Sequence, residues 1–252
     1  MLGRIMMVLG CCMPMLALAA TSPLRVCTTG DYPPLTSYQN GKFTGSAIES
    51  AKELGRYLNQ SVVFVRTTWP TLNYDVAMGH CDIAMGGISW SKQRAAKFLL
   101  SHPVSRFGKV PLIRINDKQR FHSLHDIDRH GIRVVENKGG TNEAFARIRL
   151  TKARLIIVPK NQMAFDYLLK NKADVMFTDN IEAIYRARIM PGLYVVNPNK
   201  LLTQNANVYM LPKNKPRLLN AVNAWIRKEK HTRSHTYVSY ALNHVAARNG
   251  RA

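Results

Sequence analysis

Two hydroxyl-bearing turns and one arginine could together bind carboxylates. The segment Gly86–Ser91, which includes Ser89, runs from a strand-like stretch into a helix start, and Arg94 follows one turn later. A second turn, Gly139-Gly140-Thr141-Asn142, has the same character. Hydroxyls, free amides at a helix N-terminus and a guanidinium make a good carboxylate clamp. A purely structural interpretation makes Ser91 an N-cap, leaves Arg94 as a solvated surface charge and treats the second turn as an ordinary Gly-rich turn.

Two carboxyls lie about one helical turn apart in Asp179-Asn180-Ile181-Glu182. At that spacing, both carboxyls can face the same cleft. A structural alternative is a capping box, with Asp179 as the N-cap and Glu182 as its reciprocal partner. The residues alone favour the alternative.

Aromatic side chains follow the first two strand-like segments. Tyr32 and Trp69 could sandwich a six-membered ring, and Asp31 and Asn137 could contact its edge. Packing in the core or at the rim of a cleft is the common alternative for such aromatics. The chain has no Cys/His cluster with metal-ligand spacing, so we expect neither a metal nor another cofactor.

Alternating elements are expected to position these residues. Strand-like runs at Leu24–Cys27, Val62–Val65 and Asp82–Met85 enclose two helical patterns, one with Ile48, Ala51, Leu54 and Leu58 on one face and one opened by Pro70 and closed by Gly79. This βαβαβ order predicts a parallel sheet.

The pattern then restarts and predicts a second α/β lobe. The expected strands are 132–135, 155–158, 175–177 and 194–196, and the expected helices are 141–149, 162–170 and 180–189. Crossovers at Lys109–Ile115 and Asn207–Leu211 connect the lobes, and C-terminal helices at 218–228 and 236–247 return to the first. We therefore expect a signal peptide at 1–20, lobe 1 at 21–112, lobe 2 at 113–207 and a return segment at 208–252.

The N-terminus is typical of a secretory signal peptide. Arg4 precedes an apolar run from Ile5 to Ala20, and Ala17 and Ala19 form an A-x-A cleavage pattern. This run is shorter than the ~20 residues of a spanning helix, and no second one follows, so we expect an exported protein without an integral membrane segment. Cys11 and Cys12 would leave with the signal. Cys27 and Cys81 could form a disulfide or be buried small apolar residues, and both possibilities stay open.

Charge narrows the class of partner. The 252 residues include 36 Lys and Arg against 15 Asp and Glu, a formal net charge of +21. These cations are dispersed, without a dense basic arm or an RNA-binding aromatic motif, which disfavours nucleic acid as the partner. A basic cleft that attracts a small anion is consistent with the charge. The sequence does not predict an oligomeric state.

The segment from Gly86 to Arg94, followed by Phe98, Ser101 and Pro103, resembles the signature of the extracellular solute-binding proteins for polar amino acids. This resemblance implies a two-lobed periplasmic-binding-protein fold with a parallel or mixed sheet in each lobe. It also implies that Ser89 and Arg94 hold a ligand carboxylate and that Asp179 accepts an α-ammonium group.

Four further stretches resemble the periplasmic cyclohexadienyl dehydratases, a catalytic offshoot of those binding proteins. The stretches are Leu24–Tyr32, Trp69–Leu72, Cys81–Ser89 and Asn137–Arg147. The resemblance implies a small anionic substrate, prephenate or arogenate, converted to phenylpyruvate or phenylalanine with Glu182 as the general acid and without a cofactor. Ala47 and Gln204–Asn207 depart from the dehydratase pattern.

An amino-acid-binding protein of an ABC transporter is the competing interpretation. It would use the same fold with Arg94, Thr141 and Asp179. Such a protein has no need of a protonated Glu182, so turnover of prephenate separates the two.

Overall fold

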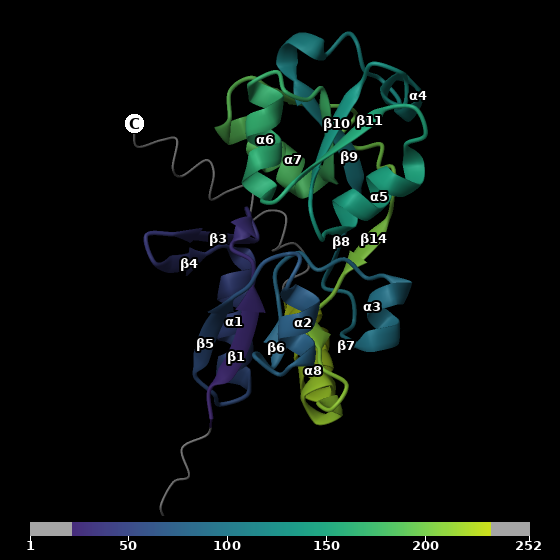
Figure 1. Ribbon diagram of the computed structural model, residues 1–252. Coiled ribbons are helices and arrows are strands. Elements are labelled where there is room, and N and C mark those ends of the chain that lie inside the picture. The colour runs from purple at the N-terminus through teal and green to yellow at the C-terminus, as the bar shows by residue number, and fades with distance from the viewer. Residues whose placement is uncertain (1–21, 233–252) are drawn as a thin grey trace, which may run out of the picture.

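A computed structural model of the chain describes residues 22–232, which form two α/β lobes (Figure 1). The predicted signal peptide at 1–20, with Cys11 and Cys12, lies outside the described residues, as does the helix expected at 236–247. Within the described residues, no helix is long and apolar enough to cross a membrane.

The first sheet has the order β5-β1-β6-β15-β7. Its strands are β1 (Leu24–Thr28), β5 (Val62–Arg66), β6 (Ile83–Ala84), β7 (Leu99–Leu100) and β15 (Met210–Leu211). β1 pairs in parallel with β5 and β6, whereas β15 runs antiparallel to β6 and β7. The helices of this lobe are α1 (Ser46–Tyr57), α2 (Leu72–Ala77), α3 (Lys92–Lys97) and α8 (Pro216–Thr232). One core cluster joins β1 to α1 and α8 through Val26, Leu54 and Trp225.

The second sheet has the order β11-β10-β12-β9-β13. Its strands are β9 (Lys109–Arg114), β10 (Arg133–Asn137), β11 (Arg154–Val158), β12 (Val175–Asp179) and β13 (Leu193–Val195). β10 is parallel to β11 and β12, and β9 is antiparallel to β12 and β13. The helices are α4 (Leu124–Ile127), α5 (Thr141–Arg149), α6 (Asn161–Leu169) and α7 (Asn180–Ile189), and a 3₁₀ turn, η1 (Ile115–Asp117), follows β9. The predicted α/β class with mixed sheets is thus confirmed.

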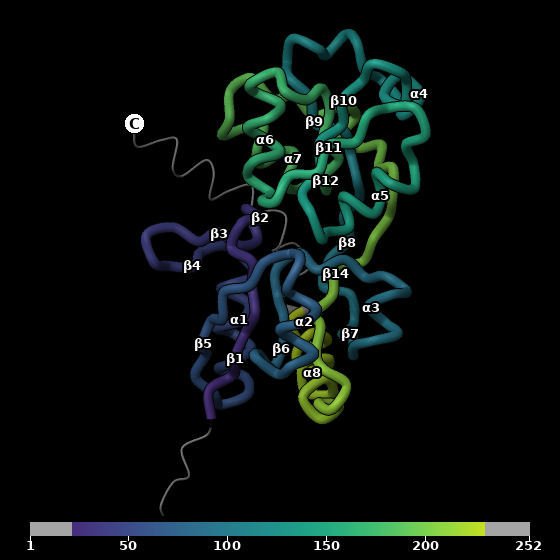
Figure 2. The backbone as a smooth tube through the Cα atoms, viewed as in Figure 1, coloured from purple at the N-terminus to yellow at the C-terminus, as the bar shows by residue number. Residues whose placement is uncertain are grey.

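Two strands cross between the lobes, but they are not the predicted ones. β8 (Ser105–Phe107) and β14 (Asn205–Asn207) form an antiparallel pair at the junction (Figures 1 and 2). The segment expected as the first crossover is β9, whose first five residues are all buried because it lies between β12 and β13. The second sheet therefore includes Lys109–Arg114, which the sequence had predicted as a crossover. Most of the second expected crossover leads into β15 of the first sheet.

A three-stranded antiparallel sheet also extends from the end of β1. It consists of β2 (Asp31–Tyr32), β3 (Thr36–Gln39) and β4 (Lys42–Thr44), in that order. The sequence analysis did not predict this sheet, since its strands are short and partly exposed. Its first strand carries Asp31 and Tyr32 away from β1 towards the second lobe.

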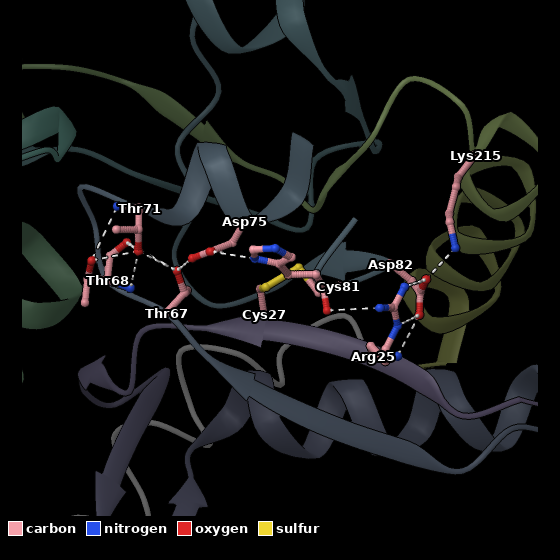
Figure 3. Close-up of a disulfide and its surroundings, with 10 residues drawn as sticks. Arg25, Cys27, Thr67, Thr68, Thr71, Asp75, Cys81, Asp82 and Lys215 are labelled. Atoms are coloured by element: carbon pink, nitrogen blue, oxygen red, sulfur yellow. Dashed lines mark hydrogen bonds and ion pairs between the residues drawn. A yellow bond between two sulfur atoms is a disulfide. The ribbon is translucent and has the colours of Figure 1, made fainter. Parts of the chain in front are cut away.

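A disulfide joins Cys27 to Cys81 across a sequence separation of 54 residues (Figure 3). Of the two possibilities that the sequence left open, a disulfide or two buried free cysteines, the structure thus shows the disulfide. The bond links β1 to the residue pair that precedes β6, in a fully buried apolar cluster. In the chain-entropy account, closing a loop of this length stabilises a domain by about 4 kcal/mol.

Candidate active site

The carboxyl ends of the parallel strands in both lobes meet around a small cavity. Its volume is about 20 Å³, and it is lined by Tyr32, Trp69, Gly87, Arg94, Lys109, Asn137, Gly140, Thr141, Asn142, Asn161 and Asp179. Seven of the ten predicted site residues therefore lie on one wall or the other, whereas Asp31, Ser89 and Glu182 do not line it. A cavity of this size holds about one water molecule. A six-membered ring can enter only when the lobes separate.

Arg94 is a buried cation that faces this cavity. Its side chain belongs to α3, the residue is 7% exposed, and its guanidinium donates to the backbone oxygen of Ser89 over 2.7 Å. The Ser91 hydroxyl caps α3 by accepting from the Arg94 amide, so the N-cap interpretation of Ser91 is correct. The interpretation of Arg94 as a solvated charge is wrong.

No carboxylate in the described part of the chain pairs with Arg94. Burial lowers the pKa of its guanidinium to about 10, because a cation loses hydration in the closed cleft. A desolvated cation without an anionic partner is stabilised when an anion binds. Arg94 is thus suited to hold a ligand carboxylate.

The second turn closes against the first lobe. Thr141 opens α5, and Asn142 and Asn137 are buried beside it. Gly139 has φ of 88°, and a Cβ there would lie 2.6 Å from the Pro70 nitrogen of the opposite lobe. Glycine is required here both by the backbone conformation and by the close approach of the lobes.

Tyr32 and Trp69 contact each other edge to face, with ring centroids 5.8 Å apart and an angle of 74° between the planes. They do not form the expected sandwich in this closed arrangement. Each ring is oriented by its polar atom: the Tyr32 hydroxyl donates to Asp179 over 2.6 Å, and Trp69 Nε1 donates to Asp31 over 3.0 Å. Asp31 thus orients Trp69, and its expected contact with the edge of a substrate ring stays a prediction.

Both oxygens of Asp179 are occupied. Lys109 Nζ lies 2.8 Å from Oδ1, and the Tyr32 hydroxyl donates to Oδ2. Asp179 stands at the N-cap position of α7, but its side chain makes no capping hydrogen bond. The capping-box alternative is thus wrong. Sequence analysis missed Lys109, although a lysine that opens an apolar run of a strand is a signal that its charge has a buried partner.

Glu182 is fully buried, and its carboxyl accepts two hydrogen bonds. Thr178 Oγ1 donates to Oε2 over 2.7 Å, and Asn161 Nδ2 donates to Oε1 over 2.9 Å. Arg186 approaches to 3.5 Å. Burial nevertheless raises the pKa of Glu182 to about 7, since desolvation outweighs these partners. Near neutral pH, a large fraction of Glu182 is protonated.

Asn161 connects Glu182 to the cavity wall and also bridges the lobes. It lines the cavity, donates to Glu182, and donates to the backbone oxygen of Asp31 over 3.0 Å. Arg186 donates to the same Asp31 oxygen over 3.3 Å. Sequence analysis missed both residues. Asn161 could have been found, because it follows the end of β11 as the other site residues follow their strands.

The two departures from the dehydratase pattern lie beside the site. Ala47 is buried in a cluster with Tyr32, Leu35, Phe107 and Ile181. Asn205–Asn207 forms β14, the second crossing strand. Neither departure belongs to the cavity wall. Both lie at contacts between the lobes, where they can affect how the lobes pack against each other.

Comparison with known proteins identifies both dehydratases and an amino-acid-binding protein as relatives of this chain. The chain is 40% identical to the cyclohexadienyl dehydratase of Pseudomonas aeruginosa over 192 residues, which cover 75% of this chain and 71% of that protein. The crystal structure of an ancestral amino-acid-binding protein, described as a precursor of cyclohexadienyl dehydratase, is 30% identical and has a TM-score of 0.80, covering 87% of this chain and 94% of that one. An ancestral cyclohexadienyl dehydratase is 42% identical with a TM-score of 0.51, covering 86% and 90%.

The family of bacterial extracellular solute-binding proteins, family 3, matches residues 24–239, which include both sheets and every residue of the cavity wall. The chain belongs to this family.

Proposed function

We propose that the protein is a cyclohexadienyl dehydratase, which converts prephenate to phenylpyruvate and arogenate to phenylalanine. The observation that carries the proposal is Glu182, a fully buried carboxyl with its pKa raised to about 7 next to a cleft that holds an uncompensated arginine. Efficient general acids have a pKa near the operating pH. The 40% identity to a cyclohexadienyl dehydratase supports the same chemistry.

The cleft can hold an anionic substrate between the lobes. Arg94 and the Thr141 turn would bind carboxylates, with Ser89 orienting the Arg94 guanidinium through its backbone oxygen. Trp69 and Tyr32 would contact the ring once the lobes have separated and closed again around it. Residues from both lobes thus have to meet for the substrate to be oriented.

In the reaction, protonated Glu182 donates its proton to the ring hydroxyl, and the carbon–oxygen bond breaks with loss of water. The electron pair of the bond to the ring carboxylate moves into the ring as carbon dioxide leaves. Aromatisation supplies the driving force. Every atom and electron is accounted for by substrate and one proton, so the proposal includes no metal or organic cofactor.

Delivery of the proton requires a change around Asn161. In the closed structure Asn161 lines the cavity, which Glu182 does not, and donates both to Glu182 and to the Asp31 backbone of the opposite lobe. Separation of the lobes breaks the bond to Asp31. Asn161 can then reorient around a bound substrate, which gives the Glu182 proton access to the departing hydroxyl.

We also propose that the protein is exported to the periplasm by cleavage of residues 1–20. Membership of an extracellular family supports this location. The corresponding division of the mature chain is lobe 1, lobe 2 and a C-terminal return to lobe 1 from 208. The pairing of β9 with β12 and β13 supports a start of lobe 2 at Lys109 instead of at 113.

An amino-acid-binding protein is the second candidate, favoured by the likeness to the ancestral amino-acid-binding protein. Turnover separates the two candidates. The purified mature protein is mixed with prephenate, and phenylpyruvate is measured over time, with the Glu182→Gln variant as a matched control. We expect enzyme-dependent formation of phenylpyruvate that the variant loses. Binding of an amino acid without turnover of prephenate or arogenate would contradict the proposal.

A further inference from the structure

We infer that Arg186 is a positioning residue for the proposed reaction, because its guanidinium lies close enough to Glu182 to ease the loss of the proton and too far away to keep the carboxyl ionised. The inference rests on the proposed function for the role of Glu182 as the acid. Arg186 acts through the acid and not on the substrate, so its role is the same for prephenate and for arogenate.

Arg186 is a buried cation of α7 that approaches the acid without a close contact. The residue is 6% exposed, and its Nη2 lies 3.5 Å from Oε1 of Glu182, which stands one helical turn earlier. Among the residues that the structure describes, it is the one cation within 4 Å of that carboxyl. This distance is longer than an ordinary N–H···O hydrogen bond. The contact is therefore an attraction between charges without a short hydrogen bond.

Three other contacts divide the Arg186 guanidinium between Glu182 and neutral groups. Nη1 donates to Gln162 Oε1 over 2.8 Å, and Nη2 donates to the backbone oxygen of Asp31 over 3.3 Å. Cζ lies 4.2 Å from the centroid of the Phe165 ring, a distance typical of a cation–π contact. Because Asp31 belongs to the opposite lobe, the arrangement is complete only when the lobes are closed.

Burial and charge act on Glu182 in opposite directions. Burial, the largest cause, raises the pKa of Glu182, the charge of Arg186 lowers it, and the outcome is a pKa of about 7. Without Arg186, the buried carboxyl would hold its proton more tightly and donate it less readily. A close ion pair with Arg186 would instead favour the ionised form. The divided guanidinium thus gives the intermediate acid strength that proton donation near neutral pH requires.

The other ionisable groups near Glu182 do not supply a cation in place of Arg186. From the neighbouring elements, they are Asp31 and Tyr32 of β2, Glu136 of β10, Asp166 of α6, and the ion pair of Lys109 and Asp179. Asp31 has the opposite effect to Arg186, since a second carboxylate raises the pKa of Glu182. Burial raises the pKa of Tyr32 and of Glu136 well above the usual values, which favours their neutral forms.

Removal of the cation tests the assignment, with the ionisation of Glu182 as the readout. In Arg186→Gln, the midpoint of this ionisation should move to higher pH by about one pH unit or more. Infrared spectroscopy measures the midpoint, as a difference from the same protein carrying Glu182→Gln, and the fall of kcat with pH should move in the same direction. A purely structural role predicts the opposite sign, because looser packing would admit water and lower the pKa of Glu182. Arg188→Gln removes an exposed charge from the same helix and should move the midpoint much less.

Gln162 offers a second test at an exposed position, where folding is not at risk. Gln162→Glu gives Nη1 of Arg186 a carboxylate in place of an amide oxygen, which draws the guanidinium away from Glu182 and should raise the midpoint. The same change made together with Arg186→Gln should have a much smaller effect, since the cation that transmits it is absent.

An unchanged or lowered midpoint in Arg186→Gln would overturn the inference. If that variant failed to fold, an unchanged midpoint in Gln162→Glu would overturn it equally. The midpoint is measured without turnover, so the two proposals fail separately. Failure to convert either prephenate or arogenate would contradict the proposed function, whereas an unmoved midpoint in an active enzyme would contradict only the role of Arg186.

Discussion

The two lobes are alike at the amino ends of their strands. In lobe 1, Arg25 of β1 binds Asp82, which precedes β6 (Figure 3). In lobe 2, Arg133 of β10 binds Asp174, which precedes β12. In both pairs, the arginine backbone nitrogen lies 2.9 Å from the carboxylate, and the guanidinium binds the same carboxylate in a fork. The same arrangement therefore links the first and third strands of each βαβαβ unit.

At the carboxyl ends the lobes differ. Lobe 1 presents Arg94 without a carboxylate partner, whereas lobe 2 presents the Lys109–Asp179 pair and, behind it, Glu182. The pKa values diverge in the same way: hydrogen bonds from Arg133 and Arg114 help hold the pKa of Asp174 at about 2, whereas burial raises that of Glu182 to about 7. At the amino ends of the strands, Asp82 and Asp174 accept hydrogen bonds from arginine and stabilise the fold. Desolvation also raises the pKa of Asp31 and Glu136, and of these three carboxyls Glu182 is the one that we propose as the general acid.

The largest effect should follow from replacing Glu182. Glu182→Gln keeps size and hydrogen-bonding capacity but has no proton to deliver, so kcat should fall ~10² to 10⁴-fold while product affinity is retained. In the wild type, kcat should decline as pH rises through about 7, because the acid must be protonated and its raised pKa is about 7. Steady-state kinetics across pH measures both. Near-wild-type turnover of the variant would assign the proton to another group.

Replacing Arg94 should act on binding. Arg94→Ala removes the uncompensated cation, and loss of a charge-assisted contact worth ~1.5 to 3 kcal/mol should weaken phenylpyruvate binding ~10- to 150-fold. The free energy of unfolding should change much less, since no carboxylate of the described residues depends on Arg94. Calorimetry with denaturant unfolding as the control tests this. Unchanged affinity would remove Arg94 from the site.

Alanine variants of two glycines with similar backbone angles distinguish an effect on lobe closure from an effect of local backbone strain. Gly139 and Gly131 have φ of 88° and 83°. A Cβ added at Gly139 would clash with Pro70, whereas a Cβ added at Gly131 would meet no other part of the chain within 4 Å. Gly139→Ala should weaken ligand binding ~10-fold relative to Gly131→Ala, because overpacking costs about 1 to 3 kcal/mol. Equal affinities of the two variants would show that this contact is not needed for closure.

The amino-end carboxylates should give the smallest effects, and on stability alone. Asp82→Asn and Asp174→Asn should each lower the free energy of unfolding by about 1 to 2 kcal/mol, since the arginine partners are partly exposed and screened. Denaturant unfolding measures the loss, and calorimetry should show unchanged product affinity. A large loss of affinity in either variant would break the contrast between the two ends of the strands.

Sequence predicted most of the elements because their patterns are local. The helices expected at 141–149 and 180–189 begin and end where α5 and α7 do, since Gly-rich or polar turns flank clear apolar periodicity. The crossing strands were placed wrongly. An apolar run such as Lys109–Arg114 marks a buried strand, but its sheet is decided by long-range pairing that the run does not encode.

Residues of the cavity wall were predicted where they lie at, or within a few residues of, the carboxyl end of β1, β5 or β10, as with Tyr32, Trp69 and Asn137. Lys109, Asn161 and Arg186 were missed because their roles arise from partners distant in sequence: Asp179 for Lys109, and Asp31 for the other two. The Tyr32–Trp69 geometry was also not predicted, since it depends on the hydrogen bond from Tyr32 to Asp179 across the cleft and on that from Trp69 to Asp31 within the first lobe.

Titration of the Glu182 carboxyl tests the central claim most directly. Difference infrared spectroscopy of the wild type against Glu182→Gln, recorded over a range of pH, isolates the signal of the protonated Glu182 side chain. The account predicts that this signal is lost with a midpoint of about 7, as burial requires. A midpoint at or below the ordinary value of 4.5 would mean that Glu182 is ionised at neutral pH and does not serve as the general acid.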